Sequence, residues 1–245
     1  MPFPADRKEA MLENSANPRW PNPALCVLGS WLRLAPEGVL ISVLLASLAM
    51  ALFFAGLSWL AWPLLVVAVG VASFFRDPAR IAPDRAGVVV SAADGKITDI
   101  CQGAPPGSAE MVQWRLSVFM SPLNVHVNRA PIAGEVTGVE HTAGEFLAAF
   151  RDQASERNER NAIVLRDLSG RSYTVVQIAG YLARRIVCRL RMHDKIAQGQ
   201  RLGLIMFGSR VDHFFPLEYR LAVERGDRVK AGVSILGQLD SEQAQ

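Results

Sequence analysis

The chain has 245 residues, half of them hydrophobic, with a formal net charge of +3 and four lysines among its 26 basic residues. This length suits one domain, or one domain with an appendage, and the modest charge gives no reason to expect a nucleic-acid partner. Three cysteines without C-x-x-C spacing exclude a disulfide scaffold and a zinc finger and favour a reducing compartment. So few lysines leave little choice for a lysine-based Schiff-base enzyme.

Residues 1–36 are polar and rich in proline, which predicts a mobile tail. Residues 37–76 are hydrophobic, and no charged residue occurs between Gly38 and Phe75. A membrane-spanning helix needs ~20 apolar residues, so this stretch is nearly long enough for two. Gly56 and Ser58 interrupt it near the middle. We therefore expect a helical hairpin in the membrane, and a single tilted span is the alternative.

The charges that flank the hydrophobic stretch indicate its orientation. Arginine occurs on both sides, at positions 19 and 33 before it and at 76, 80 and 85 after it. Positive charge marks the cytoplasmic ends of membrane helices. We expect both ends of the hairpin, and the domain that follows, on the cytoplasmic side of the inner membrane. A buried soluble helix pair is the poorer alternative, because the stretch has no polar face.

Short strands and turns follow from Gly87 onward, which predicts a mainly β domain over residues 77–245. Two of the strands are expected to pair across the turn Asp167–Gly170. Residues 145–157 are compatible with either a short helix or a mobile loop. The expected extended segments are Val88–Val90, Trp114–Met120, Val125–Asn128, Gly134–Val139, Ala162–Leu165 and Ser172–Ile178.

A weak internal repeat lies near the end of the chain. Asp194–Gly199 reads D-K-I-A-Q-G, and Asp227–Gly232 reads D-R-V-K-A-G. Each copy precedes an apolar strand that ends in glycine, at Gly208 and Gly237. Such turns also occur in lipoyl-type carrier domains, but no lysine here has the setting of a modified carrier lysine. We therefore interpret the repeat as two similar β units packed in a sandwich or barrel.

The step Gly208-Ser209 follows a strand-like apolar run, Leu204–Phe207, and precedes a polar, charged segment. By itself this step is weak evidence for function, because Gly-Ser also occurs at positions 29–30 and 107–108. Both residue types favour turns, so most such steps are simple bends. Only the motifs elsewhere in the chain distinguish Gly208-Ser209 from the other two.

Six motifs occur in one order between about residues 74 and 236, and together they resemble the phosphatidylserine decarboxylase family. The resemblance is closest to its short branch, which has Gly-Ser-Arg where the longer branch has Gly-Ser-Thr. The motifs are Phe75-Arg76-Asp77-Pro78, Ala93-Asp94-Gly95-Lys96, Met120-Ser121-Pro122-Leu123-Asn124-Val125-His126-Val127-Asn128-Arg129, Asn158-Glu159-Arg160-Asn161, Gln177-Ile178-Ala179-Gly180 and Phe207-Gly208-Ser209-Arg210-Val211-Asp212.

The resemblance implies that the protein cuts itself between Gly208 and Ser209. The Ser209 hydroxyl attacks the Gly208 carbonyl, and Ser209 becomes a pyruvoyl group that forms a Schiff base with the substrate amine. The upstream chain is then 1–208 and the downstream chain 209–245, and the two stay together as a heterodimer. The implied reaction is decarboxylation of phosphatidylserine, a membrane lipid, to phosphatidylethanolamine and CO2. Oligomeric state and the choice between diacyl and ether-linked lipids stay open.

The resemblance also implies roles for individual residues. His126 is the candidate general acid or base, because histidine side chains ordinarily titrate near neutral pH, and Asp94 is expected to orient it as in a catalytic triad. Arg129 occupies the position at which the longer branch has a second histidine. Either His126 alone therefore performs the roles that two histidines share in the longer branch, or Arg129 holds the substrate. Asn158 and Arg160 are candidates for binding the headgroup.

Two other function classes are alternatives to the decarboxylase. A zinc hydrolase would need a ligand set, but the histidines show neither H-x-H nor H-E-x-x-H spacing, so no metal is expected. A membrane-anchored β module without enzymatic activity would give a single intact chain on a denaturing gel. The decarboxylase would give two chains.

Overall fold

The computed structural model describes residues 34–107, 111–144, 157–180, 185–206 and 209–240. Most of the expected tail, most of the segment 145–157 and Gly208 lie outside these ranges. The described residues fall into two compact units that divide between Ala79 and Arg80.

The smaller unit is a pair of apolar helices, α2 (Pro36–Phe54) and α3 (Ser58–Phe74). Gly56 has a φ of +77° in the tight turn between them, a backbone conformation that glycine adopts readily. At the base of the pair, the Ala35 N–H donates to the Phe75 carbonyl at 2.7 Å. The expected pair of helices joined by a turn is therefore confirmed, and its place in a membrane stays a prediction. Of its helices, α2 is long and apolar enough to cross a membrane, whereas α3 is shorter.

The larger unit is mainly β, as expected. Its described strands are β1 (Val88–Val90), β2 (Gly95–Gly103), β3 (Gln113–Met120), β4 (Val127–Arg129), β5 (Gly134–Thr142), β6 (Arg160–Arg166), β7 (Ser172–Ile178), β8 (Ile186–Cys188), β9 (Lys195–Ile196), β10 (Arg201–Ile205), β11 (Ser209–Phe215), β12 (Arg220–Leu221), β13 (Arg228–Val229) and β14 (Ile235–Gln238). All pairings between them are antiparallel.

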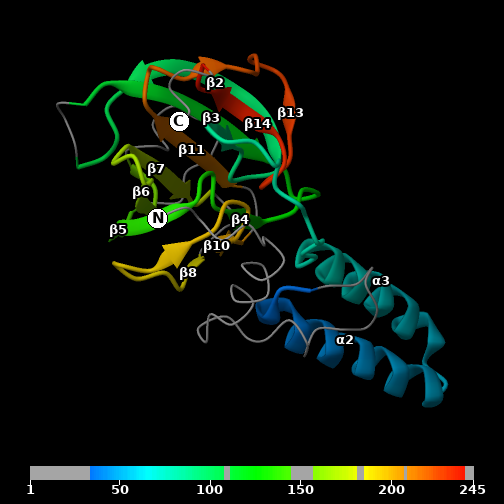
Figure 1. Ribbon diagram of the computed structural model, residues 1–245. Helices are drawn as coiled ribbons and strands as arrows, with labels where there is room; N and C mark the ends of the chain where they lie inside the picture. The colour runs from blue at the N-terminus through cyan, green and yellow to red at the C-terminus, as the bar shows by residue number, and fades with distance from the viewer. Residues whose placement is uncertain (1–33, 108–110, 145–156, 181–184, 207–208, 241–245) are drawn as a thin grey trace. The chain divides into compact units, whose positions relative to one another are not determined.

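Among the described strands, eight form one sheet in the order β13-β2-β3-β11-β7-β6-β5-β9. The others form two three-stranded sheets, β1-β14-β12 and β4-β10-β8. Figure 1 shows the large sheet as a curled layer that runs from β2 and β3 through β11 and β7 to β6 and β5. The expected hairpin across Asp167–Gly170 is confirmed, because β6 and β7 pair from Arg160↔Ile178 to Arg166↔Ser172.

The sheet order repeats itself on either side of the central pair β11–β7. Strands β1, β2, β3, β11, β12, β13 and β14 make the same pairings with one another as β4, β5, β6, β7, β8, β9 and β10 make among themselves. We call the first set the split half, because the second set, the inserted half, interrupts it in the chain. The expected step Gly208-Ser209 lies where the chain returns from β10 of the inserted half to β11 of the split half.

The internal repeat marks equivalent turns in the two halves. The Asp194 carbonyl accepts the Val136 N–H at the edge of β5, and the Asp227 carbonyl accepts the Ile97 N–H at the edge of β2, both at 2.9 Å. The glycines that end these turns have φ values of +78° at Gly199 and +71° at Gly232. The structure therefore agrees with the interpretation of the repeat as two similar β units.

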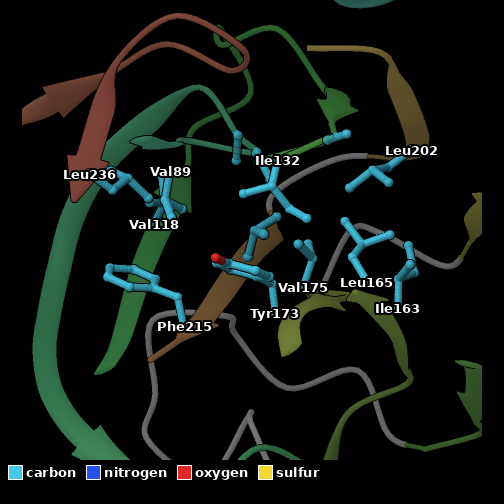
Figure 2. Close-up of a cluster of buried hydrophobic side chains, with 14 of the residues drawn as sticks. Val89, Val118, Ile132, Ile163, Leu165, Tyr173, Val175, Leu202, Phe215 and Leu236 are labelled. Atoms are coloured by element: carbon cyan, nitrogen blue, oxygen red, sulfur yellow. The ribbon is translucent and has the colours of Figure 1, made fainter. Parts of the chain in front are cut away.

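The two halves share one hydrophobic core. In Figure 2, Val118, Phe215 and Leu236 come from the split half, and Ile163 and Leu202 come from the inserted half. All five side chains are fully buried. Because both halves contribute to the same core, neither the chain before position 209 nor the chain after it contains a complete core of its own.

Candidate active site

Ser209 is the first residue of β11, which lies in the centre of the large sheet. Its backbone pairs with Met120 at the end of β3, and its side chain is fully buried. The Ser209 hydroxyl donates to the Met120 sulfur at an Oγ–Sδ distance of 3.4 Å. A thioether is a weak acceptor, so loss of this hydrogen bond costs little free energy.

His126 lies beside the strand that leads to the expected cleavage site. Its backbone carbonyl accepts the N–H of Ile205, the last residue of β10, at 3.3 Å. The ring is fully buried, and Nδ1 lies 2.9 Å from the Asn124 carbonyl oxygen. A carbonyl only accepts, so Nδ1 carries the proton and Nε2 is the basic nitrogen of the neutral ring. His126 and Ser209 are thus anchored to the two segments that flank residues 206–208.

Asp94 is buried, but its described hydrogen bonds do not include a histidine. The Arg80 guanidinium forms a two-pronged ion pair with the carboxylate, with Nη2 2.7 Å from Oδ2. The N–H of Ala231 donates to Oδ1 at 2.7 Å, and Arg80 also donates to the Ala231 carbonyl. These bonds connect the beginning of the β domain to the segment just before β14. The sequence indicated Asp94 but gave no signal for Arg80, which lies outside the motifs.

Arg129 is buried at the end of β4, and its Nη1 donates to the Gly199 carbonyl at 3.0 Å. Its side chain also lies against the second repeat turn, because a Cβ added at Gly232 would lie 3.0 Å from Arg129 Cδ. Arg129 thus contacts the last glycine of both repeat turns. Arg129 is therefore buried because it packs between the repeat turns of the two halves.

Asn158 and Arg160 differ in their surroundings. The Asn158 side chain is buried and donates to the Ala179 carbonyl at 2.7 Å. Arg160 begins β6 and is half-buried. Asn158 therefore connects two backbone segments, and Arg160 is the more accessible of the two headgroup candidates.

Two charged residues, Arg210 and Asp212, alternate with Ser209 and Val211 along β11 and therefore lie on the other face of the strand. Arg210 and Asp212 form a buried two-pronged ion pair, with distances of 2.7 Å for Nε–Oδ1 and 2.8 Å for Nη2–Oδ2. Arg115 approaches the same carboxylate at 3.7 Å. Removal of either partner of such a buried pair would leave an uncompensated charge, which strongly destabilises a protein.

A row of three buried amides reaches the Ser209 site, and the sequence motifs indicated a role for none of them. Asn161 Nδ2 donates to Gln177 Oε1 at 3.0 Å, and Gln177 Nε2 donates to Asn128 Oδ1 at 2.8 Å. Asn128 Nδ2 then lies 3.7 Å from the same Met120 sulfur that accepts the Ser209 hydroxyl. We call Asn161, Gln177 and Asn128 the amide row. One signal was available: Gln177 is a polar residue in the otherwise apolar run Val175–Ala179.

His213, also on β11, is a buried histidine outside the proposed chemistry. Its Nε2 accepts the Ala92 N–H at 2.7 Å, and its Nδ1 donates to the Leu116 carbonyl at 3.2 Å. Burial lowers the pKa of His213 to about 4, so the ring is neutral at pH 7. Within the described ranges, no three His, Cys, Asp or Glu side chains gather in a way that could hold a metal ion.

Comparison with known proteins identifies the family. The profile of phosphatidylserine decarboxylase matches residues 69–237. A phosphatidylserine decarboxylase proenzyme of Ralstonia nicotianae is 47% identical over 76% of this chain and 86% of its own length. The proenzymes of Ralstonia pickettii and Mycolicibacterium smegmatis are 43% and 45% identical, over 91% and 79% of this chain and 100% and 85% of their own lengths.

The matched region includes most of the β domain, with Ser209, His126 and the amide row. It also reaches the end of α3. A match to more than half of the chain, with relatives of this identity along most of their length, establishes common ancestry and fold. The chain therefore belongs to the phosphatidylserine decarboxylase family.

Proposed function

We propose that this protein is a pyruvoyl-dependent decarboxylase, which cuts its own chain between Gly208 and Ser209 and converts phosphatidylserine to phosphatidylethanolamine and CO2. The observation that carries the proposal is the position of Ser209, a buried serine at the start of a central strand, where the chain passes between two halves of one core. The relatives support the substrate and the processing, because they are named phosphatidylserine decarboxylase proenzymes.

The cut needs no external reagent except water. Ser209 Oγ attacks the Gly208 carbonyl carbon, the C–N bond breaks, and the hydroxyl proton moves to the released nitrogen, which leaves an ester. Loss of the Ser209 Cα proton then breaks the Cβ–Oγ bond and frees Gly208 as a carboxylate. The resulting enamine becomes an imine, and water converts it to a ketone with release of ammonia. Gly208 favours this sequence because it has no Cβ to obstruct the strained ring.

The surroundings of Ser209 fit the proposed group. The hydroxyl interacts with a thioether, so its replacement by the methyl of a pyruvoyl group forfeits only a weak hydrogen bond. The ketone at residue 209 supplies an electron sink for the electrons released when CO2 leaves the substrate.

His126 is the residue we propose for proton transfer. Its hydrogen bond to the Asn124 carbonyl supports this role, because it fixes the tautomer and leaves Nε2 as the basic atom. We propose that Nε2 accepts the Ser209 hydroxyl proton during the cut and later donates a proton to the carbon from which CO2 departs. The contacts of Asp94 with Arg80 and Ala231 favour a supporting role in which Asp94 holds the domain together across the cut.

Arg160 is the residue we propose for the anionic headgroup. It is half-buried at the start of β6, the strand that also carries Asn161 of the amide row. A guanidinium binds phosphate or carboxylate with two parallel hydrogen bonds. Arg129 and Asn158 are weaker candidates, because each donates a hydrogen bond to a backbone carbonyl.

We also propose that α2 and α3 attach the protein to the cell membrane, with the β domain on the cytoplasmic side. Large apolar side chains on these helices are exposed, Phe54 at 81% and Val66 at 71%. Water would disfavour such a surface, whereas lipid would not. Membrane attachment suits a substrate that stays in the bilayer.

The mass of the purified protein under denaturing conditions tests the proposed cut. We expect two chains, the smaller of 245 − 208 = 37 residues, with no free amino terminus on the smaller one. Ser209→Ala removes the attacking oxygen and should leave one chain of full length. Ser172→Ala is the matched control, because Ser172 begins β7, the equivalent strand of the inserted half. Cleavage of Ser209→Ala at the same bond would exclude the mechanism.

The role of His126 has its own test. His126→Ala should slow the cut, decarboxylation or both by roughly 10²–10⁴-fold, the usual contribution of proton transfer. His141→Ala is the control, because His141 is exposed and pairs with Glu159. Conversion to two chains is followed by denaturing gel, and turnover by release of labelled CO2. Wild-type rates for both processes in His126→Ala would contradict the assignment.

A further inference from the structure

We propose that Gln177 is a positioning residue for self-cleavage, which acts through Asn128 and Met120 on the hydroxyl of Ser209. This inference rests on the proposed cut at Gly208-Ser209 and adds residues to which the family motifs gave no role. The amide row is fully enclosed: Asn161 is 2% exposed, and Gln177 and Asn128 are 0% exposed.

Gln177 contacts both strands that lead to the cut. It lies on β7 and pairs with Val211 of β11, two residues after Ser209. Its amide also packs against β10, where a Cβ added at Gly203 would lie 2.8 Å from Gln177 Nε2. The same Cβ would lie 2.6 Å from the Val187 carbonyl oxygen, so the absence of a side chain at Gly203 lets β10 approach both β8 and the Gln177 amide. Gln177 therefore lies next to both the strand before residues 206–208 and the strand after them.

The hydrogen bond between Asn128 and the Ala92 carbonyl, at one end of the amide row, determines which amide donates and which accepts along the row. Asn128 Nδ2 lies 3.4 Å from the Ala92 carbonyl, which only accepts, so Asn128 must turn its NH2 group toward Ala92 and Met120. Its oxygen then faces Gln177, which must donate through Nε2 and accept from Asn161 through Oε1. Each amide thus has one orientation that satisfies all its neighbours.

Met120 transmits this order to Ser209. Its sulfur lies 3.7 Å from Asn128 Nδ2 and 3.4 Å from Ser209 Oγ. The sulfur therefore receives two donors, and its position fixes where the serine oxygen can lie. The acyl shift requires that oxygen within attacking distance of the Gly208 carbonyl carbon, and a misplacement of ~1 Å can slow such a step by roughly 10²-fold.

The proposed role ends when the cut is complete. Ser209 Oγ leaves as part of the Gly208 carboxylate, so no hydroxyl remains to be positioned during decarboxylation. A positioning role predicts a defect in the cut without a defect in turnover by chains already cut. A merely structural role predicts that both rates fall together with stability.

Gln177→Glu tests the inference with almost no change in volume. A carboxylate offers two acceptors, so Asn128 would have to reverse and turn its oxygen toward the Ala92 carbonyl. We expect the conversion to two chains to slow by roughly 10–100-fold, as for other misplaced reacting groups. The rate of decarboxylation per cut chain should stay within about twofold of the wild-type rate. Loss of an interaction worth ~1.4 kcal/mol in the decarboxylation step would instead lower that rate about tenfold.

Hydroxylamine identifies the step at which the variant stalls. It cleaves esters readily and amides slowly, so it cuts a chain that has completed the acyl shift and spares one that has not. We expect uncut Gln177→Glu to resist hydroxylamine, because the attack by Ser209 is the step that loses its geometry. Accumulation of a hydroxylamine-sensitive chain would overturn the inference, since the acyl shift would then have proceeded normally.

Two further variants separate positioning from stability. Gln113→Glu is the matched control, because Gln113 is 1% exposed, donates to the Ser172 carbonyl at 3.0 Å and lies at the opposite end of β3 from Met120. It should be cut at the wild-type rate. Asn161→Asp perturbs the far end of the amide row and should also slow the cut and stall as the amide. Stability of all three is compared by urea unfolding with Ser209→Ala present, so that every chain stays intact.

Failure of the inference differs from failure of the proposed function. If Ser209→Ala is still cut, the proposed function is wrong. If Ser209→Ala stays intact while Gln177→Glu and Asn161→Asp are cut at the wild-type rate, only the inference is wrong. It is also wrong if Gln113→Glu slows the cut equally, or if both row variants fail to fold while Gln113→Glu folds, because the amide row would then serve folding alone.

Discussion

His213 and His126 are both fully buried, yet their hydrogen bonds suit them to different tasks. His213 is bonded on both ring nitrogens to backbone groups of Ala92 and Leu116, which fixes it as a neutral structural residue. His126 has Nδ1 bonded to the Asn124 carbonyl, which leaves Nε2 as the basic atom. At the residue scale, the backbone partners of each ring thus distinguish a histidine that holds strands together from one suited to proton transfer.

The lowered pKa of His213 predicts how stability depends on pH. Its pKa is about 4 in the folded chain and 6.5 in the unfolded chain. Between these values the unfolded chain binds a proton that the folded chain does not, so the free energy of unfolding falls as the pH falls from 6.5 toward 4. The loss should total ~3 kcal/mol at ~1.4 kcal/mol per pKa unit.

Urea unfolding at pH 7 and pH 4.5 measures this effect in the Ser209→Ala chain. His213→Gln is the comparison, because glutamine accepts and donates as the neutral ring does but does not titrate. We expect the difference between the two pH values to be smaller in His213→Gln by ~2–3 kcal/mol. Equal pH dependence in the two chains would show that His213 does not contribute.

At the element scale, close contacts between strands decide where glycine is required. Gly134 begins β5 in the inserted half, and a Cβ there would lie 2.2 Å from the Arg166 carbonyl oxygen. Gly95 begins the equivalent strand β2, and a Cβ there would lie 2.1 Å from the Phe119 carbonyl oxygen. The same steric constraint thus occurs at the same place in both halves, as their matching pairings require.

Gly134→Ala should destabilise the protein, because the backbone of β6 must move to admit the methyl group. We expect a loss of ~1–3 kcal/mol, typical of overpacking. Gly138→Ala on the same strand is the control, since a Cβ there would meet Val164 at an ordinary 3.5 Å. Thermal unfolding with Ser209→Ala present compares the two variants. A melting temperature for Gly134→Ala equal to that of Gly138→Ala would contradict the steric argument.

The helical pair is the other element with a testable role. Deletion of residues 1–78 removes α2 and α3 but keeps Arg80, whose guanidinium binds Asp94. We expect the truncated protein to be found in the soluble fraction and not in the membrane fraction, because it lacks the exposed apolar side chains that favour lipid. The full-length protein should resist extraction by alkaline carbonate. Release of the full-length protein by carbonate would instead indicate attachment to the membrane surface.

At the scale of the whole molecule, the proposed cut separates strands that belong to one core. The downstream chain carries β11, which pairs with β3 on one side and β7 on the other. Side chains add further contacts across the cut: Ala231 donates to Asp94, and the Tyr173 and Tyr219 hydroxyls lie 2.5 Å apart. These contacts explain how two chains could remain one folded unit.

The cut chains should therefore stay together until the protein unfolds. We expect residues 1–208 and 209–245 to elute as one particle in size exclusion under native conditions and to separate in denaturant. Addition of urea should release the smaller chain in the same transition as the loss of β structure, because it supplies the central strand of the sheet. Release of the smaller chain well before unfolding would contradict this account.

Features that depend on local pattern could be predicted from consecutive residues alone. An uncharged apolar stretch with a glycine break predicts two helices, and alternation and turn residues predict strands such as Ser172–Ile178. Motif order pointed to the family and to Gly208-Ser209. Each of these predictions depends only on residues that are close together in the sequence.

Contacts between residues far apart in the chain could be found only from the folded structure. The pairing of Asp94 with Arg80 and the amide row of Asn161, Gln177 and Asn128 depend on strand register and on packing between sheets. The match between the split and inserted halves likewise emerges from pairings between strands far apart in the chain. Hydrogen bonds between side chains depend on distances in space, and a linear sequence does not specify those distances until the strands are paired.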